Sequence, residues 1–145
     1  MLFRSLLGVK RSDGLGDVLR AVFEGIAYAH RVDIERLLSG YDAAKPTTIR
    51  LAGGASRSEI WTQMFADVLG LPIEVTDGTE LGARGVAIAS AVAIGAHPDF
   101  ETAIARMVRV RHRCEPSAER HAADAPKFAR FQALTRALAR DWAAG

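Results

Sequence analysis

The sequence predicts a mixed α/β domain, because two short β-strand patterns are separated by a tight turn and an amphipathic helical pattern. The first strand pattern covers residues 47–52, is rich in β-branched side chains and ends at Gly53 and Gly54. The second covers residues 72–75 and follows Gly70, where the intervening helix is expected to end. Further helical patterns stand on both sides of this strand–turn–helix–strand unit.

The helix inside this unit has a recognisable start. Ser56 and Glu59 have the spacing of a capping box, in which a hydroxyl and a carboxylate bind the free N–H groups that open a helix. The apolar face of the helix is expected to consist of Ile60, Trp61, Met64, Phe65 and Val68. Trp61 is therefore interpreted as a core residue in preference to a platform for stacking adenine. Asp67 and Glu80 are interpreted as helix-surface or capping residues.

Long helices are expected before and after the unit. Residues 17–38 carry apolar side chains at mostly helical spacing, and Gly40 follows as a stop signal. A second capping box, from Asp77 to Glu80, would open a helix over residues 81–94. Its many glycines and alanines would permit close packing against a neighbouring backbone.

The remaining chain predicts a short helix, an extended segment and a final helix. The short helix is expected at residues 99–108 and the extended segment at 109–115. Pro126 is expected to open the final helix, because proline is tolerated in a first turn. The apolar stripe of this helix would be Phe128, Phe131, Leu134, Leu138 and Trp142.

Composition limits the classes of function. The chain has 145 residues, 49% hydrophobic and 25% charged, as is typical of one globular domain. The net charge of +2 is small and the arginines are spread along the chain, so nucleic-acid binding is not indicated. No apolar run of about 18 residues predicts a membrane span. The single Cys114 cannot form an internal disulfide, and a cytoplasmic location is expected.

Histidine and arginine offer weaker candidate sites. The four histidines lack metal-ligand spacing, and no Ser or Cys is credibly paired with them as nucleophile and base. Arg109, Arg111 and Arg113 alternate, which on a strand would place three guanidinium groups on one face. A solvated sheet edge is favoured over phosphate or nucleic-acid binding, because no aromatic residues interleave to stack bases.

Gly53 and Gly54 form the candidate site with the clearest chemistry. Glycine leaves no Cβ in the way of a ligand, and the start of the following helix favours anions. Taken alone, the pair is a weak signal, because two glycines between a strand and a helix are more often plain turn chemistry. The surrounding sequence adds context: segments 51–61 (LAGGASRSEIW) and 65–70 (FADVLG) resemble the adenosine-binding segment of the FGGY family of carbohydrate kinases.

Further segments carry the same resemblance. Residues 80–89 (ELGARGVAIA) resemble the small-residue helix that follows in that family, at the usual distance. Residues 8–9 with 17–24 (DVLRAVFE) resemble most of the family's second signature. The region 107–121 is similar to the tail of xylulokinase-like members.

The resemblance implies a fold and a reaction. The fold would be α/β, the C-terminal part of an actin-like ATPase domain of the ribonuclease H type. Residues 1–145 would form a partial C-terminal nucleotide-binding domain, with the phosphate loop, the catalytic Asp and the sugar site in an N-terminal domain outside this sequence. The complete kinase would use ATP and Mg²⁺ to phosphorylate a hydroxyl of a ketopentose such as xylulose, or of a polyol. These residues alone are expected to be inactive.

The resemblance also implies binding residues and partners. Gly53, Gly54, Ala55 and Ser58 would contact the adenine nucleotide, with Gly54 acting through its backbone. Ser58 stands where some members place an Asn, and a plain first-turn role in the helix is its alternative. No catalytic or metal-ligating residue is expected, and the N-terminal kinase domain is the expected protein partner. The alternatives are a stand-alone nucleotide-binding or regulatory half-domain and a structural module that self-associates into a homo-oligomer.

Overall fold

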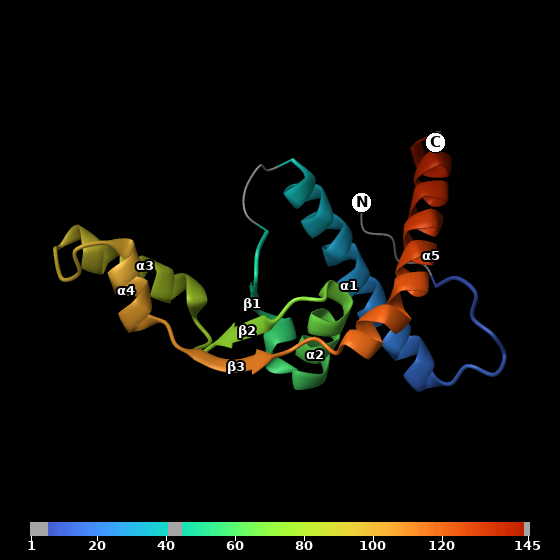
Figure 1. The fold of residues 1–145 in the computed structure, drawn as a ribbon, viewed down its shortest axis with the longest axis horizontal. Helices are drawn as coiled ribbons and strands as arrows, with labels where there is room; N and C mark the ends of the chain where they lie inside the picture. The colour runs from blue at the N-terminus through green and yellow to red at the C-terminus, as the bar shows by residue number, and fades with distance from the viewer. Residues whose placement is uncertain (1–5, 41–44, 144–145) are drawn as a thin grey trace. The chain divides into compact units, whose positions relative to one another are not determined.

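The computed structural model describes residues 6–40 and 45–143, with side chains up to residue 139, and these residues divide into two compact units. The first unit comprises the described residues up to 45, a short segment at 67–70, and residues from 116 onward. The second comprises residues 46–66 and 71–115. Figure 1 colours the elements along the chain.

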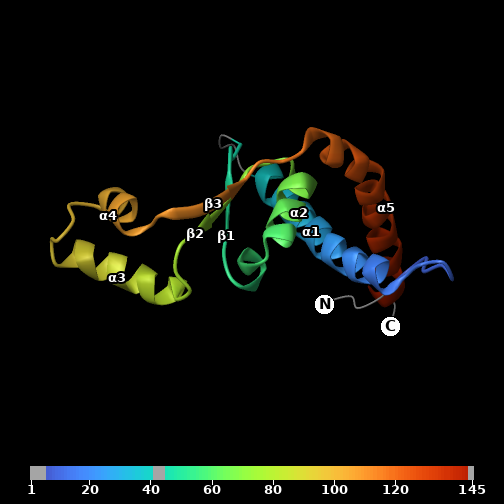
Figure 2. The same cartoon turned by 90° about the horizontal axis from the view of Figure 1, so that it is seen from below.

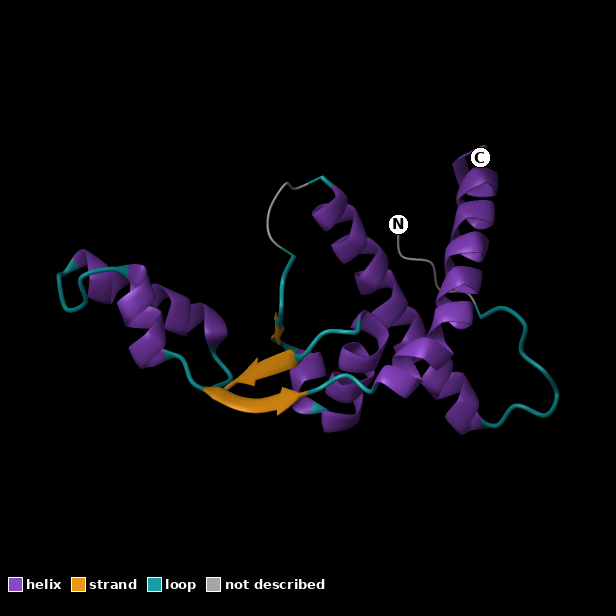
Figure 3. Cartoon of the chain, in the orientation of Figure 1, coloured by secondary structure: helices purple, strands orange, loops and turns teal. Residues whose placement is uncertain are grey.

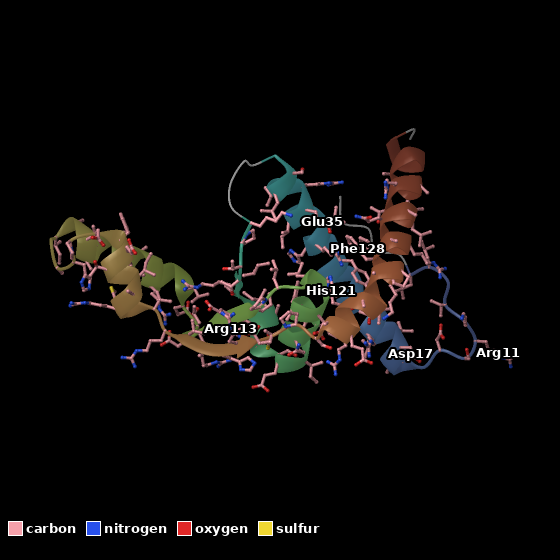
Figure 4. The ribbon with its side chains drawn as sticks, viewed as in Figure 1. Arg11, Asp17, Glu35, Arg113, His121 and Phe128 are labelled. Carbon is pink, nitrogen blue, oxygen red and sulfur yellow. The ribbon has the colours of Figure 1, made fainter. Side chains whose placement is uncertain are left out.

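Two long helices, α1 (Leu15–Ser39) and α5 (Ala118–Ala143), form most of the first unit. The predicted helix over residues 17–38 is confirmed as α1. Its core contact is Tyr28, which is buried and whose ring centroid lies 5.8 Å from that of Phe128. The Arg31 guanidinium lies over the Phe128 ring, 4.1 Å from its centroid. Phe128 is labelled on α5 in Figure 4.

The start of α5 differs from the prediction at Pro126, because the helix begins eight residues earlier. The buried Asp67 carboxylate accepts a hydrogen bond from the Ser117 backbone N–H over 2.8 Å, and the Ser117 hydroxyl oxygen accepts one from the Arg120 N–H over 3.3 Å. These bonds satisfy N–H groups that open the helix. Pro126 therefore lies inside α5, which changes direction along its length (Figure 2).

Two other sequence interpretations in this unit need correction. Asp67 is 4% exposed, so it caps a distant helix from a buried position and is not a helix-surface residue. The predicted stripe on α5 is only partly buried, since Phe128 is 6% exposed but Leu134 is 36% exposed. Trp142 lies outside the described side chains.

A three-stranded sheet forms the centre of the second unit, as Figure 3 shows in orange. The strands are β1 (Ile49–Leu51), β2 (Ile73–Thr76) and β3 (Val110–Cys114), in the order β1-β2-β3. β1 pairs in parallel with β2, with Ile49 opposite Ile73, and β2 pairs antiparallel with β3. The mixed α/β class and the extended segment at 109–115 are thereby confirmed.

Helices connect the strands. The short 3-10 helix η1 (Gly54–Arg57) and α2 (Glu59–Leu69) lead from β1 towards β2, whereas α3 (Leu81–Ala93) and α4 (Phe100–Met107) lead from β2 to β3. α3 and α4 lie side by side (Figure 1). The start of α4 agrees with prediction, because the Asp99 carboxylate accepts the Thr102 N–H over 2.7 Å. In the part of the chain that the structure describes, no helix is long and apolar enough to cross a bilayer.

The predicted capping box at Ser56 is wrong. The Ser56 hydroxyl donates to the Gly53 carbonyl oxygen over 2.7 Å, which holds the 3-10 turn. Ser58 provides the cap instead, because its hydroxyl oxygen accepts the Trp61 N–H over 3.3 Å and the helix begins at Glu59.

The buried face of α2 also differs from prediction at one position. Thr62 and Phe65 are buried, whereas Ile60 is 82% exposed. Ile60 is two residues from Thr62, which places it about 200° around the helix. Trp61 packs against Phe65 with ring centroids 5.8 Å apart, in agreement with a core role.

Candidate functional site

A pocket of about 130 Å³ lies where β1 and β2 end. Because the two strands are parallel, their carboxyl ends lie at the same edge of the sheet, and each leads into a loop containing glycine. This is the usual position of ligand sites in parallel sheets. The residues around the pocket are Leu51, Gly53, Gly54, Ser56, Arg57, Val75, Thr76, Gly78, Thr79, Leu81 and Arg111.

The loop after β1 supplies two of the four predicted binding residues to the pocket, Gly53 and Gly54. Gly53 has φ 82° and ψ −157°, a conformation that side-chain-bearing residues rarely adopt. A Cβ placed on Gly54 would meet no atom within 4 Å, so the backbone there is open to a ligand. Ala55 and Ser58 do not line the pocket, and the Ser58 hydroxyl is used as the cap of α2.

The loop after β2 is held by Asp77. Its carboxylate accepts hydrogen bonds from the Arg84 guanidinium over 2.7 Å and from the Arg109 backbone N–H over 3.4 Å. Partial desolvation raises the pKa of the Asp77 carboxyl, but these two hydrogen bonds outweigh it and hold the pKa below its usual value. The Asp77–Glu80 capping box is therefore wrong, because Asp77 is used by other partners and the Glu80 side chain makes no capping bond.

A β-bulge brings Arg111 to the same pocket. Val75 pairs with His112 and Thr76 pairs with Val110, so Arg111 is the extra residue on β3. The predicted single face of three arginines is interrupted at this point. Sequence reasoning left Arg111 out of the binding set, because a bulge carries no signal in an alternating strand pattern.

The neighbouring Arg113, labelled in Figure 4, belongs to a different arrangement. Its guanidinium forms ion pairs with Glu74 over 2.8 Å and with Glu115 over 2.6 Å, and Arg50 pairs with Glu74 from β1 over 3.2 Å. The hydrogen bond from Arg50, joined by the one from Arg113, lowers the pKa of Glu74 although partial desolvation opposes it. This part of β3 is a charged sheet edge, as expected.

His112 and Cys114 form a contact that the sequence pattern does not predict. The His112 Nε2 and Cys114 Sγ atoms are 3.0 Å apart, because residues two apart on a strand share one face. Cys114 is only 5% exposed and neither residue lines the pocket. The pair is therefore part of the packed sheet.

The pocket does not have the chemistry of a protein-bound magnesium site. Mg²⁺ prefers carboxylate and other oxygen ligands, and the residues around the pocket include no Asp or Glu. Across the described residues, no group of three His, Cys, Asp or Glu side chains is placed to hold a metal ion. The pocket has instead glycine backbone, the hydroxyl-bearing residues Ser56, Thr76 and Thr79, and two guanidinium groups.

Comparisons with known proteins agree with the resemblance seen in the sequence. A family model described as "FGGY family of carbohydrate kinases, C-terminal domain" matches residues 2–94. Glycerol kinase 1 of Thermotoga maritima is 36% identical over 112 residues, which are 77% of this chain and 22% of that protein. L-xylulose/3-keto-L-gulonate kinase of Escherichia coli is 31% identical over 121 residues, which are 83% of this chain and 24% of that protein.

Solved structures of carbohydrate kinases also match the fold of this chain. The crystal structure of a xylulose kinase from Lactobacillus acidophilus matches with a TM-score of 0.84 at 23% identity, over 93% of this chain and 27% of that one. The chain belongs to the FGGY family of carbohydrate kinases and has the fold of the C-terminal part of these actin-like ATPase proteins. It spans about a quarter of the length of the relatives that it matches.

Proposed function

We propose that this chain is the adenine-nucleotide-binding part of an ATP-dependent carbohydrate kinase. The observation that carries the proposal is the pocket at the carboxyl ends of β1 and β2, where the open backbone of Gly54 adjoins the sharp turn at Gly53. The relatives are named as glycerol and xylulose kinases, which favours a polyol or a ketopentose such as xylulose as the phosphoryl acceptor.

The residues around the pocket have defined roles in this proposal. Gly54 allows the nucleotide to approach the backbone, and Gly53 maintains the turn that presents it. Thr79 offers a hydroxyl from the opposite loop. Ala55 and Ser58 complete the expected binding set, Ser58 through the oxygen that also caps α2. ATP supplies the phosphoryl group, and these residues bind and orient the nucleotide.

The remaining chemistry is assigned to an N-terminal kinase domain, which would be the main protein partner. The pocket residues include no carboxylate that could serve as general base for a sugar hydroxyl or as a ligand of Mg²⁺. We therefore expect these 145 residues to form no sugar phosphate by themselves. Recovery of turnover on adding an N-terminal half would support the kinase over a stand-alone regulatory half-domain. A cytoplasmic location is part of the same proposal.

NMR titration with ADP tests the nucleotide site directly. Signals from the backbone amides between Gly53 and Ile60 are expected to shift, with millimolar affinity, about 4 kcal/mol of binding free energy, because only part of a complete site is present. The variant Gly54→Val would place a branched side chain where the nucleotide approaches. It is expected to remain folded, since a Cβ there meets no atom within 4 Å, and to lose most of the ADP-induced shifts.

Gly40→Ala is the matched control. Gly40 ends α1 with φ −95°, and among the described residues a Cβ there meets only the Leu37 carbonyl oxygen, at 4.0 Å. The variant is therefore expected to bind ADP like the parent. The proposal is wrong if ADP shifts no amide signal from Gly53 to Ile60, or if folded Gly54→Val binds as well as the parent.

A further inference from the structure

Two arginine side chains from separate parts of the second unit reach the pocket without a carboxylate partner. Arg57 ends η1, and Arg111 is the bulge residue of β3. Within the described residues, neither guanidinium makes an ion pair or a hydrogen bond. By contrast, Arg50, Arg84 and Arg113 in the same unit are each paired with a carboxylate. The pocket therefore has positive charge that the described residues do not neutralise.

The bulge explains why Arg111 differs from its neighbour on β3. Arg113 pairs across the strands with Glu74, which lies directly opposite it in the register. At Arg111 the register shifts, so no residue of β2 stands opposite this side chain. Bulges redirect side chains and occur often beside active sites. The irregular backbone thus separates Arg111 from the ion pairs of the sheet edge and leaves it at the pocket.

The ligand that fits this arrangement is a phosphate group. The planar guanidinium presents paired N–H donors that match phosphate oxygens, and two of them converge on a pocket without Asp or Glu. We propose that Arg57 and Arg111 bind the phosphate chain of the adenine nucleotide, with Arg111 as the principal contact. The inference rests on the proposed nucleotide site beside Gly54, and it adds two side-chain contacts that the glycine motif does not contain.

The alternative role for these side chains is contact with the base. Arginine also stacks on aromatic rings, and adenine is such a ring. The two roles differ in which part of the nucleotide each variant should affect. A phosphate contact strengthens binding of ADP but not of adenosine and weakens as salt is added, whereas a stacking contact strengthens binding of both.

The test compares ADP with adenosine on the full 145-residue chain and its Arg111→Gln and Arg57→Gln variants. The parent is expected to bind ADP more tightly than adenosine, and Arg111→Gln to weaken ADP binding by about tenfold, the scale of one charge-assisted hydrogen-bonded pair. Arg57→Gln is expected to have a smaller effect in the same direction. Adenosine binding should be unchanged in both variants, and inorganic pyrophosphate should compete with ADP on the parent.

Arg106→Gln is the matched control, because it removes the same charge from an exposed position on α4 that does not line the pocket. Arg111→Lys keeps the positive charge but lacks the planar guanidinium group. Its affinity for ADP is expected to lie between those of the parent and of Arg111→Gln. If ADP binds beside Gly54 but Arg111→Gln and Arg106→Gln bind it equally, the arginine assignment is wrong and the nucleotide site stands. The phosphate assignment would also be wrong if Arg111→Gln weakened the binding of adenosine and of ADP equally. If neither ligand shifts the loop signals, both proposals fail.

Discussion

The Ser117 backbone N–H donates a 2.8 Å hydrogen bond to the Asp67 carboxylate, so a side chain near the end of α2 caps a helix that begins fifty residues later. The Arg120 guanidinium lies 3.4 Å from the same carboxylate, and the His121 Nδ1 atom lies 2.8 Å from the Asp67 backbone carbonyl oxygen. Figure 4 labels His121 on α5. This cluster determines where α5 starts.

Removing this cap is expected to destabilise the first unit. Asp67→Ala should lower the free energy of unfolding by about 1–3 kcal/mol, because it leaves the partly buried Ser117 N–H at the start of α5 without its acceptor. Asp67→Asn, which keeps an acceptor oxygen, should lose less. Chemical denaturation followed by circular dichroism measures the difference. The exposed Asp33→Ala serves as the control, and an equal loss there would argue against the cap.

Tyr28 makes stability depend on pH at the alkaline end. Its hydroxyl donates to the Asp124 Oδ1 atom over 3.3 Å, and burial, with the nearby Asp124 charge, raises the pKa of the phenol well above its usual value. The folded state thus favours the protonated phenol. This stabilisation is fully present below pH about 10, the pKa of an unfolded tyrosine, and is lost as the pH rises further.

The Tyr28→Phe variant tests this dependence. At neutral pH its free energy of unfolding should be lower by about 1 kcal/mol, the value of one hydrogen bond. The loss is no larger because the Asp124 carboxylate keeps the Lys127 ammonium, 3.0 Å away, as a partner. Above pH about 10 its stability should fall less steeply than that of the parent. Parallel curves for the two proteins in this range would contradict the prediction. Tyrosinate absorbance gives an independent measurement of the ionisation.

Glu74 is expected to make the free energy of unfolding of the second unit fall at acid pH. It pairs with Arg50 on one side and Arg113 on the other, and both are its direct register partners in the sheet. Because its pKa is lowered in the folded state, the stabilisation is present above the unfolded pKa of about 4.3 and is lost as the pH falls through the folded value. Glu74→Gln should make the free energy of unfolding depend less on pH in this acid range. Glu101→Gln, at an exposed position, should leave the dependence unchanged. Added salt should weaken the difference.

The elements predicted correctly are those specified by local sequence. The apolar spacing of α1 and the Asp99 cap of α4 depend on residues within one or two turns, and both helices lie where they were expected. The sequence also predicts the tight turn after β1 from its two glycines. Gly53 has a positive φ there, a conformation that favours glycine. Local patterns therefore located both the sheet and the loop that lines the pocket.

The wrong predictions involve bonds between residues distant in sequence, or a choice between two serines that could each cap the same helix. The sequence places the start of α5 at Pro126, because the cap at Ser117 depends on Asp67, fifty residues away. Ser56 and Ser58 are both plausible helix caps in a sequence. The Ser56 hydroxyl instead binds the Gly53 carbonyl oxygen in the 3-10 turn, and Ser58 caps α2. The bulge at Arg111 had no sequence signal, so the charged part of the candidate site emerged only from the fold.

Self-association is expected through an exposed apolar stripe on α1. Leu15, Leu19, Val22 and Ile26 follow helical spacing and are 76%, 50%, 43% and 38% exposed. A contiguous apolar stripe of this kind marks a surface that is covered by a partner. In the absence of a kinase N-terminal domain, a second copy of the chain is the available partner, and sedimentation equilibrium should show a concentration-dependent dimer.

The double variant Leu19→Gln with Val22→Gln tests which surface forms the dimer. It should weaken the dimer by at least about a hundredfold, because each of the two apolar side chains removed from the interface forfeits about 1.5–3 kcal/mol of burial. Ile60→Gln is the control: Ile60 is 82% exposed but lies on α2, outside the stripe, so this variant should associate like the parent. A parent chain that remains monomeric at high concentration, or a double variant that dimerises as strongly as Ile60→Gln, would show that the α1 stripe does not drive self-association.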